Sequence, residues 1–122
     1  MKILVVEDHQ SLRTMLAAGL ATFGHEVTVA ADGEEGIEVV KNLSGELDAV
    51  VTDRQMPKRD GFEVARFVKA HFPAVKVVMM TADLSDDVER RAFAAGVDAA
   101  LQKPLASLER FENFLRALVE SR

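Results

Sequence analysis

Residues that could bind a metal ion and a phosphoryl group stand at the ends of four apolar runs in this chain. The runs are ILVV at 3–6, AVVT at 49–52, VKVVMM at 75–80 and AAL at 99–101. Directly behind them stand Glu7 and Asp8, Asp53, Thr81 and, after one intervening residue, Lys103. If the runs are parallel strands of one sheet, their carboxyl ends lie along one edge, where ligands of open α/β sheets bind. We therefore expect three carboxylates, a hydroxyl and an ammonium group to converge at this edge.

Glu7, Asp8 and Asp53 would form an acidic cluster if the runs that precede them are neighbouring strands. Two like charges about 4 Å apart repel by roughly 4 kcal/mol at an effective dielectric constant of about 20. A hard divalent cation relieves this repulsion, and a ligand set made only of oxygen atoms suits Mg²⁺, with Mn²⁺ as an alternative. The cluster therefore indicates a magnesium site.

Asp53 could also act as a nucleophile toward phosphorus, because a carboxylate can attack a phosphoryl group once a metal ion and a cation screen its charge. Lys103 would supply a positive charge, Thr81 a hydroxyl donor, and the small side chain of Ala82 would leave room for the group to enter. Lys103 alone would be an ordinary surface lysine, and Thr81 alone an ordinary strand-end threonine. It is the combination that indicates phosphoryl chemistry.

Strand-like and helix-like segments alternate five times along the chain, which predicts a parallel sheet covered by helices on both faces. We expect strands at 2–6, 26–30, 48–52, 75–80 and 98–102, and helices at 10–23, 36–43, 61–71, 85–95 and 107–120. The first, third and fourth strands are almost wholly apolar and should be central, whereas the second alternates and should lie nearer an edge. Asp32-Gly33 is interpreted as a turn.

Length and composition predict a single soluble globular domain spanning residues 1–122. Hydrophobic residues make up 48% of the chain and charged residues 29%, and the absence of cysteine excludes disulfides and thiolate metal sites. A net charge of −5 argues against direct nucleic-acid binding. The apolar stretches are too short to insert into a membrane, and no signal-peptide pattern is present, so we expect a cytoplasmic protein.

Four stretches together resemble the receiver domain of response regulators, the phosphoacceptor module of two-component signalling. They are VVEDH at 5–9, DAVVTDRQMPKRDGFEV at 48–64, VVMMTA at 77–82 and GVDAALQKPL at 96–105, and the resemblance covers the whole chain. It implies a flavodoxin-like (βα)5 doubly wound fold with a five-stranded parallel sheet in the order 2-1-3-4-5. It also implies a phosphoacceptor that assists its own phosphorylation and dephosphorylation, rather than a true enzyme.

By this resemblance Asp53 accepts a phosphoryl group from a phosphohistidine of a histidine kinase or a histidine phosphotransfer protein. Asp8 and Asp53 would bind Mg²⁺ directly, Glu7 largely through a water molecule, and the backbone carbonyl of Gln55 would complete the protein ligands. The resemblance further implies that Lys103 pairs with the phosphoryl group and precedes a cis peptide bond.

The switch implied by the resemblance depends on two residues, and this chain carries only one of them. Thr81 would turn inward to the phosphoryl group, but the aromatic residue that usually stands three positions before the lysine is replaced by Ala100. We therefore expect the output change to run through Thr81, the loop at 82–85 and the following helix. Asp83, at the mouth of the site, and Gln55 could tune the lifetime of the phosphoryl group.

The three histidines are interpreted as residues without a metal-binding role. His9 would begin the loop into the first helix, and His25 and His71 look like loop and helix-end residues.

Two other functions compete with a phosphorylatable switch. A haloacid-dehalogenase-type phosphatase also uses a strand-end aspartate, but it needs a second acid two residues later, where this chain has Gln55. A receiver-fold interaction module that works without phosphorylation is the other alternative, to which Ala100 lends some weight. The downstream protein target is unknown, and the partner surface is expected on the fourth helix, fifth strand and last helix. We expect a stand-alone receiver, or a piece of a longer regulator.

Overall fold

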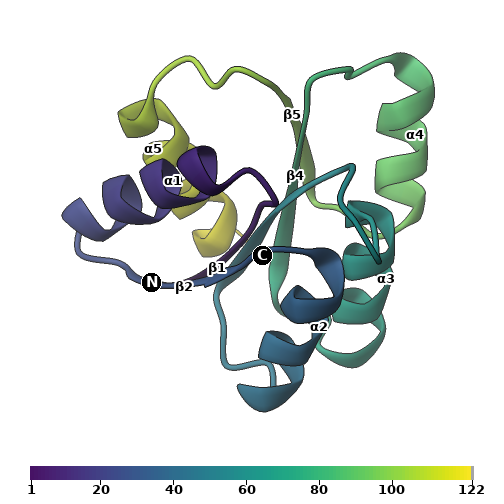
Figure 1. Cartoon of the computed structure of the whole chain (residues 1–122), viewed down its shortest axis with the longest axis horizontal. Helices are drawn as coiled ribbons and strands as arrows, with labels where there is room; N and C mark the ends of the chain where they lie inside the picture. Colours follow the sequence, from purple (N-terminus) through teal and green to yellow (C-terminus); the bar gives the residue numbers. More distant parts are fainter. Residues whose placement is uncertain (122) are drawn as a thin grey trace.

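The computed structural model describes residues 1–121 and contains one parallel five-stranded sheet in the order β2-β1-β3-β4-β5 (Figure 1). This is the order implied by the resemblance, so the predicted flavodoxin-like fold is confirmed. As predicted, β2 lies at an edge and the three most apolar strands are central. The strands are β1 (Lys2–Val6), β2 (Glu26–Ala30), β3 (Ala49–Asp53), β4 (Lys76–Thr81) and β5 (Ala99–Gln102).

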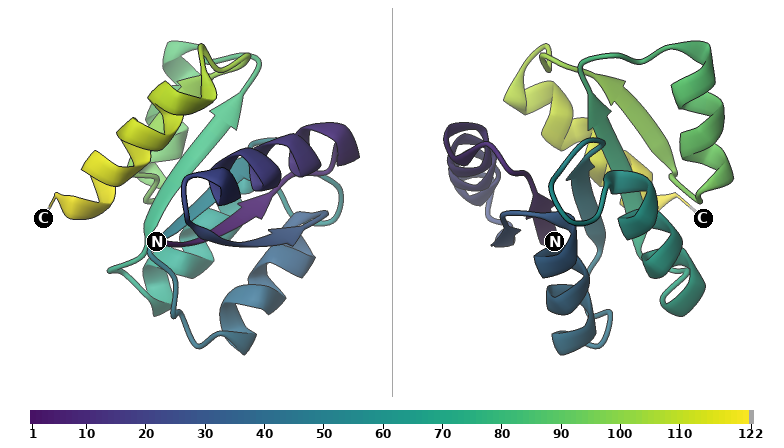
Figure 2. Two further views of the ribbon diagram at one scale, coloured as in Figure 1. Left: turned by 90° about the vertical axis from the view of Figure 1, so that its left-hand side faces the viewer. Right: turned by 45° about the vertical axis from the view of Figure 1, so that its right-hand side comes forward.

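Five helices cover the two faces of the sheet. Two of them lie side by side on one face, and the other three cover the opposite face (Figures 1 and 2). The first group consists of α1 (Gln10–Thr22) and α5 (Leu108–Glu120), and the second of α2 (Gly33–Asn42), α3 (Gly61–His71) and α4 (Asp86–Ala94). Among residues 1–121, no helix has both the length and the apolar character needed to span a bilayer.

The sheet separates two apolar cores, and β1 contributes to both of them. Ile3 and Val5 pack with α1 and α5, whereas Leu4 and Val6 pack with the helices of the other face, and all four side chains are fully buried. Successive strand residues point to opposite faces. A strand covered on both faces therefore needs a continuous apolar run, as the sequence predicted. Each fully buried aliphatic side chain contributes about 1.5–3 kcal/mol to folding.

Side-chain caps mark the start of four of the five helices, and one of them corrects a sequence prediction. Asp32 accepts a hydrogen bond from the Glu35 N–H at 2.8 Å, so α2 begins at Gly33 rather than at residue 36, and the predicted turn at Asp32-Gly33 is wrong. Aspartate favours turns and helix N-caps for the same reason, because its carboxylate bonds nearby backbone N–H groups. At α3, Asp60 and Glu63 form a complete capping box.

His25 lies in the loop before β2, as expected, but its ring makes contacts that the sequence did not predict. Its Nε2 lies 2.7 Å from Glu112 Oε2, and Arg116 donates to the same carboxylate oxygen. Glu112 is only 2% exposed. The hydrogen bonds satisfy a carboxylate that would otherwise be buried at a high cost, and they connect α5 to the loop before β2.

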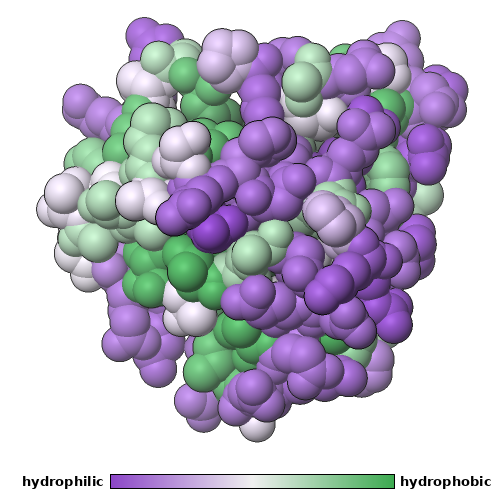
Figure 3. Space-filling view, in the orientation of Figure 1, coloured by the Kyte–Doolittle hydropathy of each residue, from purple (hydrophilic) through white to green (hydrophobic). Residues whose placement is uncertain are grey.

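The hydropathy of the surface differs between helices in the view of Figure 3. Hydrophilic residues dominate over α3 and α4, whereas hydrophobic residues gather around α1. Met15 of α1 is 57% exposed, the highest exposure of any large hydrophobic side chain among the described residues.

Candidate functional site

The carboxyl ends of β1, β3 and β5 bring three acids and a lysine together. Val6 of β1 pairs with Thr52 of β3, so the residues after β1 stand beside the last residue of β3, which is Asp53. The Lys103 ammonium follows β5 and lies 3.0 Å from Glu7 Oε1 and 3.1 Å from Asp53 Oδ1. The convergence of the acids with Lys103 at one sheet edge is the arrangement expected from the sequence.

The acidic residues offer a ligand set for a hard cation. One ligand atom each from Glu7, Asp8, His9 and Asp53 lies within 4.8 Å of the others. Asp8 Oδ1 is buried and has no hydrogen-bond partner among residues 1–121. His9 Nδ1 lies 3.4 Å from it, but that ring nitrogen is 3.2 Å from Glu7 Oε2. A buried carboxylate oxygen without a donor is costly, so the donor set fits a divalent cation with oxygen ligands.

His9 lies closer to this cluster than the sequence suggested. It is the N-cap residue of α1 without a side-chain cap hydrogen bond, and its ring faces the two acids that precede it. Its side chain is 72% exposed. The position directly after Glu7-Asp8 was the only available signal in the sequence.

Burial and charge set the electrostatics of the cluster. Burial raises the pKa of Asp53, and the nearby charge of Glu7 raises it further, while Lys103 offsets only part of the shift. Burial also acts to raise the pKa of Glu7. Hydrogen bonds from the His9 N–H and the Lys103 ammonium outweigh it, however, and hold the pKa of Glu7 below its usual value. Burial opposes the charge on Lys103, but its two carboxylate partners raise the pKa of the ammonium group. Of Glu7 and Asp53, Asp53 is therefore the acid whose negative charge is less compensated.

Thr81 is buried at the end of β4, and its hydroxyl bonds partners that the sequence did not predict. Thr81 Oγ1 accepts a hydrogen bond from Arg54 Nε at 3.0 Å and another from the Asp83 N–H at 3.2 Å. Among the described residues the Thr81 hydroxyl makes no hydrogen bond with Asp53 or Lys103, whereas the Thr81 carbonyl accepts one from the Lys103 N–H at 2.8 Å. The one available signal for Arg54 was its place directly after Asp53.

The backbone around Arg54 is fixed at both ends of the residue. Its N–H donates to Met80 O at 3.0 Å and to Asp53 Oδ1 at 2.9 Å, and its carbonyl accepts from the Gly61 N–H at 2.7 Å. A Cβ atom on Gly61 would lie 2.3 Å from Asp53 O, so only glycine allows this close approach. The loop between β3 and α3 therefore closes against the end of β3.

A second missed side chain, Gln102, connects the loop after β4 to β5. Its amide nitrogen donates to the Ala82 carbonyl, and its amide oxygen accepts from the Leu84 N–H at 2.9 Å. Ala100 pairs with Met79 and packs, half-buried, against the core under α3 and α4. The small Ala100 side chain brings no aromatic ring to β5, and Gln102 makes the contacts between β5 and the loop.

The remaining predicted residues lie at the rim of the site. Ala82, Asp83 and Gln55 are exposed. Within residues 1–121 no hydrogen bond reaches the Gln55 carbonyl, so its role as a ligand stays a prediction. The Lys103–Pro104 peptide bond is cis, which confirms the expectation from the resemblance.

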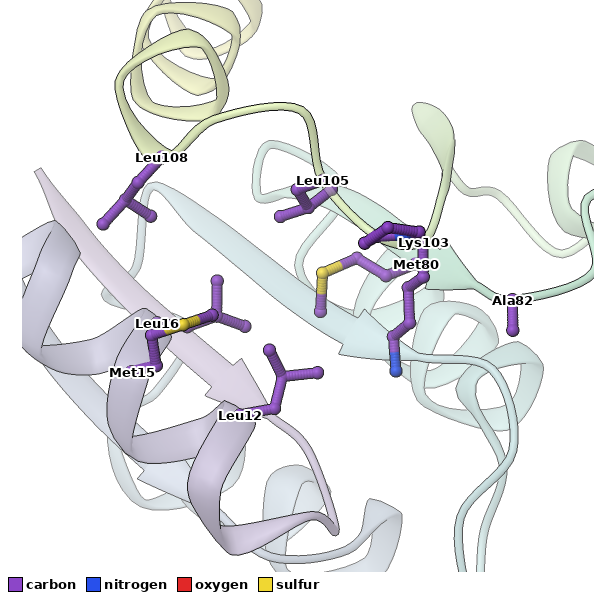
Figure 4. A pocket seen from close by; sticks show the side chains of 9 residues that line it. Leu12, Met15, Leu16, Met80, Ala82, Lys103, Leu105 and Leu108 are labelled. Atoms are coloured by element: carbon purple, nitrogen blue, oxygen red, sulfur yellow. The ribbon is translucent and has the colours of Figure 1, made fainter.

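An apolar cavity of about 540 Å³ adjoins the site on the side of α1. Leu12 and Leu16 of α1 face Met80 and Leu105 across it, and the Lys103 side chain runs along its wall (Figure 4). Lys103 thus borders both the cavity and the acidic cluster.

Comparison with known proteins identifies relatives along nearly the whole chain. Residues 3–115 match the family model described as the response regulator receiver domain. The chain is 36% identical over 118 residues to response regulator MprA of Mycobacterium sp. (strain KMS), a match that covers 97% of this chain and 50% of that protein. It is 32% identical over 114 residues to hybrid signal transduction histidine kinase L of Dictyostelium discoideum, covering 88% of this chain and 7% of the kinase. The chain thus spans about half the length of MprA.

Solved structures agree with this match. Chemotaxis protein CheY4 of Vibrio cholerae is similar, with a TM-score of 0.87, 28% identity, and coverage of 96% of this chain and 97% of CheY4. The receiver domain of sensor histidine kinase PA1611 from Pseudomonas aeruginosa PAO1 has a TM-score of 0.87 and 26% identity, with 98% of each chain covered. That structure holds a magnesium ion coordinated in its active-site cleft.

Proposed function

The chain belongs to the response regulator receiver domain family, and from this premise we propose that it is a signalling switch phosphorylated on Asp53. The observation that carries the proposal is the environment of Asp53. This carboxylate lies at the end of β3 with the Lys103 ammonium 3.1 Å away and two further acids beside it. A nucleophile, a cation and a set of metal ligands thus occupy one edge of the sheet. We assign residues 1–122 to one receiver domain.

The proposed reaction transfers a phosphoryl group from a phosphohistidine of a histidine kinase or histidine phosphotransfer protein. A carboxylate oxygen of Asp53 attacks phosphorus, the new O–P bond forms, and the N–P bond to imidazole breaks. The imidazole leaves with the electron pair of that bond and takes its proton from solvent. Lys103, now paired with Asp53 and Glu7, would shift toward the phosphoryl oxygens and offset their charge.

Asp8 and Asp53 would hold Mg²⁺, or Mn²⁺ in its place, together with the Gln55 carbonyl, and Glu7 would act through a water molecule. The ion would screen the negative charge of the incoming phosphoryl group. The buried, unpartnered Asp8 Oδ1 supports this assignment. The magnesium seen in the PA1611 receiver domain supports it by family likeness.

We propose that the phosphoryl group draws the Thr81 hydroxyl toward Asp53 and thereby shifts the loop at 82–85. Gln102 contacts this loop from β5, so movement of the loop would be passed to β5 despite Ala100. Exposed aromatic side chains of the α4–β5–α5 face, Phe93 and Phe114, support that face as the surface for the downstream protein target. Gln55 and Asp83 at the rim would influence hydrolysis of the acyl phosphate.

The phosphodonor would approach along the edge where Lys103 borders both the acidic cluster and the apolar cavity. The exposed Met15 on the cavity rim supports contact with apolar side chains of such a partner. The proposal includes no direct nucleic-acid contact by this domain, and the cytoplasm remains the predicted location.

Incubation with a small acyl phosphate and Mg²⁺, followed by intact-mass measurement, tests the proposal. We expect one phosphate adduct on the wild-type chain and none on Asp53→Asn. Asp48→Asn is a matched control, because Asp48 lies directly before the amino end of β3, far from Asp53. Its carboxylate accepts a hydrogen bond from the Lys2 N–H. No adduct on any of these chains would favour an interaction module without phosphorylation. Steady release of phosphate from an ester would favour a phosphatase.

A further inference from the structure

The Thr81 hydroxyl is held by a charged side chain from the neighbouring strand end. Arg54 Nε donates to Thr81 Oγ1 at 3.0 Å, and the Asp83 N–H donates to the same oxygen at 3.2 Å. A hydroxyl oxygen has two lone pairs, so these two donors occupy its acceptor capacity. Thr81 is only 2% exposed, which leaves no solvent to take the place of a lost donor.

Arg54 reaches Thr81 from a backbone that cannot shift freely. Its N–H bonds both Met80 O and Asp53 Oδ1, and its carbonyl bonds the Gly61 N–H. These contacts fix the Cα position, and the side-chain hydrogen bond to Thr81 Oγ1 holds the guanidinium. Among residues 1–121 the guanidinium forms no ion pair with an acid, although it belongs to the residue next to Asp53.

We propose that Arg54 is a positioning residue that holds Thr81 away from Asp53 in the unphosphorylated protein and so opposes the switch. This inference rests on the proposed function, in which the Thr81 hydroxyl turns toward the phosphoryl group. A hydroxyl that turns toward Asp53 gives up at least one of its two donors. The hydrogen bond from a charged donor is the stronger of the two, so releasing Arg54 is the larger part of the cost.

The restraint predicts that loss of the Arg54 donor favours phosphorylation. Only molecules in which the Thr81 hydroxyl is released from Arg54 are ready to stabilise the phosphoryl group. The apparent phosphorylation rate is therefore proportional to the fraction of molecules in that state. Removing one hydrogen bond of this kind should raise that fraction, and the phosphorylation rate with a small acyl phosphate, about three- to tenfold.

Two substitutions of Arg54 distinguish between two roles. In the first role Arg54 restrains Thr81, and in the second its positive charge attracts the phosphodonor. Arg54→Met removes both the donor and the charge, whereas Arg54→Lys keeps a charge but lacks the planar Nε–H fork. The restraint predicts faster phosphorylation in both variants. If charge attraction were the role of Arg54, Arg54→Met would be slower and Arg54→Lys close to wild type, and this result would overturn the proposal. Arg59→Met is the matched control, because Arg59 lies in the same loop and its guanidinium forms an exposed ion pair with Glu63.

A measurement without any phosphodonor keeps this inference distinguishable from the proposed function. Three-bond couplings that report the Thr81 side-chain rotamer are measured by NMR in the metal-free, unphosphorylated protein. We expect one rotamer in wild type and Arg59→Met, and averaging between rotamers in Arg54→Met and Arg54→Lys. An unchanged single rotamer in the Arg54 variants would overturn the restraint, even if the chain is phosphorylated normally. Averaging in a chain that no acyl phosphate modifies would support the restraint and reject the proposed function.

Thr81→Val tests whether Arg54 acts through the hydroxyl. In this background Arg54→Met should leave the phosphorylation rate unchanged, because the acceptor is already absent. An equally large effect of Arg54→Met with and without the hydroxyl would contradict the proposal.

Discussion

The Lys103 ammonium lies 3.0 Å from Glu7 Oε1, and the Glu7 side chain has no solvent exposure. The two residues stand 96 positions apart in the chain, so this ion pair forms only when β1 and β5 are both in place. A buried carboxylate that loses its cation keeps the full cost of desolvation. The lysine assigned to the phosphoryl group therefore also stabilises the fold before phosphorylation.

Lys103→Met should lower the free energy of unfolding by about 2–4 kcal/mol, because it leaves Glu7 buried and without its cation. Urea denaturation of the metal-free protein measures this change. Lys41→Met is the control, since the Lys41–Glu38 pair is largely exposed and should contribute less than about 1 kcal/mol. Equal losses in the two variants would contradict the importance of the buried pair.

Asp53→Asn should stabilise the metal-free protein at neutral pH. Burial and the charge of Glu7 raise the pKa of Asp53, so the folded chain holds this proton more tightly than the unfolded chain does. Stability then falls as the pH rises from the ordinary aspartate pKa through the raised one. Asparagine removes this loss, so the melting temperature with a chelator should exceed that of wild type by a few degrees at about pH 7.5.

The stability difference between Asp53→Asn and the wild type should depend on pH. As the pH falls through about 4, the ordinary aspartate pKa, both states of the wild type become protonated and the advantage of Asp53→Asn should shrink. Asp83→Asn, at an exposed acid of the neighbouring loop, should change the melting temperature much less. If Asp53→Asn is less stable than the wild type at every pH between about 4 and 7.5, the negative charge of Asp53 does not destabilise the metal-free protein.

Mg²⁺ should raise the melting temperature of the wild-type chain, because it binds the folded cluster and not the unfolded chain. At about ten times its dissociation constant the ion contributes roughly 1.4 kcal/mol. Asp8→Asn should remove most of this gain, whereas Asp83→Asn should keep it. A thermal shift that is the same in Asp8→Asn and wild type would place the bound ion elsewhere.

The sequence predicted those features that follow from strand ends and periodicity. Glu7, Asp8, Asp53 and Lys103 each follow an apolar run by a fixed offset, and parallel strands must bring such positions to one edge. The order of the strands came from resemblance, since alternation alone does not distinguish it from other parallel sheets. The start of α2 was missed because Asp32 serves equally well in a turn and as a helix cap.

The contacts that surround Thr81 could not be predicted in the same way. Arg54 and Gln102 have long side chains with several rotatable bonds, so their positions in the sequence do not say where their polar ends lie. The Arg54 guanidinium bonds Thr81, and the Arg54 backbone bonds Met80 and Gly61, and these contacts arise only in the folded chain. His25 was missed for a related reason, because its partner Glu112 is 87 positions away.

Gln102→Leu should release the loop after β4 while leaving the fold largely intact. The substitution keeps the side chain's size but removes the donor to Ala82 O and the acceptor for the Leu84 N–H. Because Gln102 is exposed, the loss of global stability should stay below about 1.5 kcal/mol. Amide hydrogen exchange at Leu84 should become about tenfold faster, since that N–H loses its acceptor.

The same variant tests whether Gln102 carries the signal to β5 in a chain with Ala100. On phosphorylation, chemical shifts of residues 82–85 should still change in Gln102→Leu, whereas changes at residues 99–102 should be much smaller than in wild type. Ala100→Tyr in the Gln102→Leu background supplies the aromatic residue usual at that position, and it should restore part of the response in β5. If the shifts of residues 99–102 respond fully in Gln102→Leu, the signal reaches β5 by the direct pairing of Thr81 with Gln102 through the backbone.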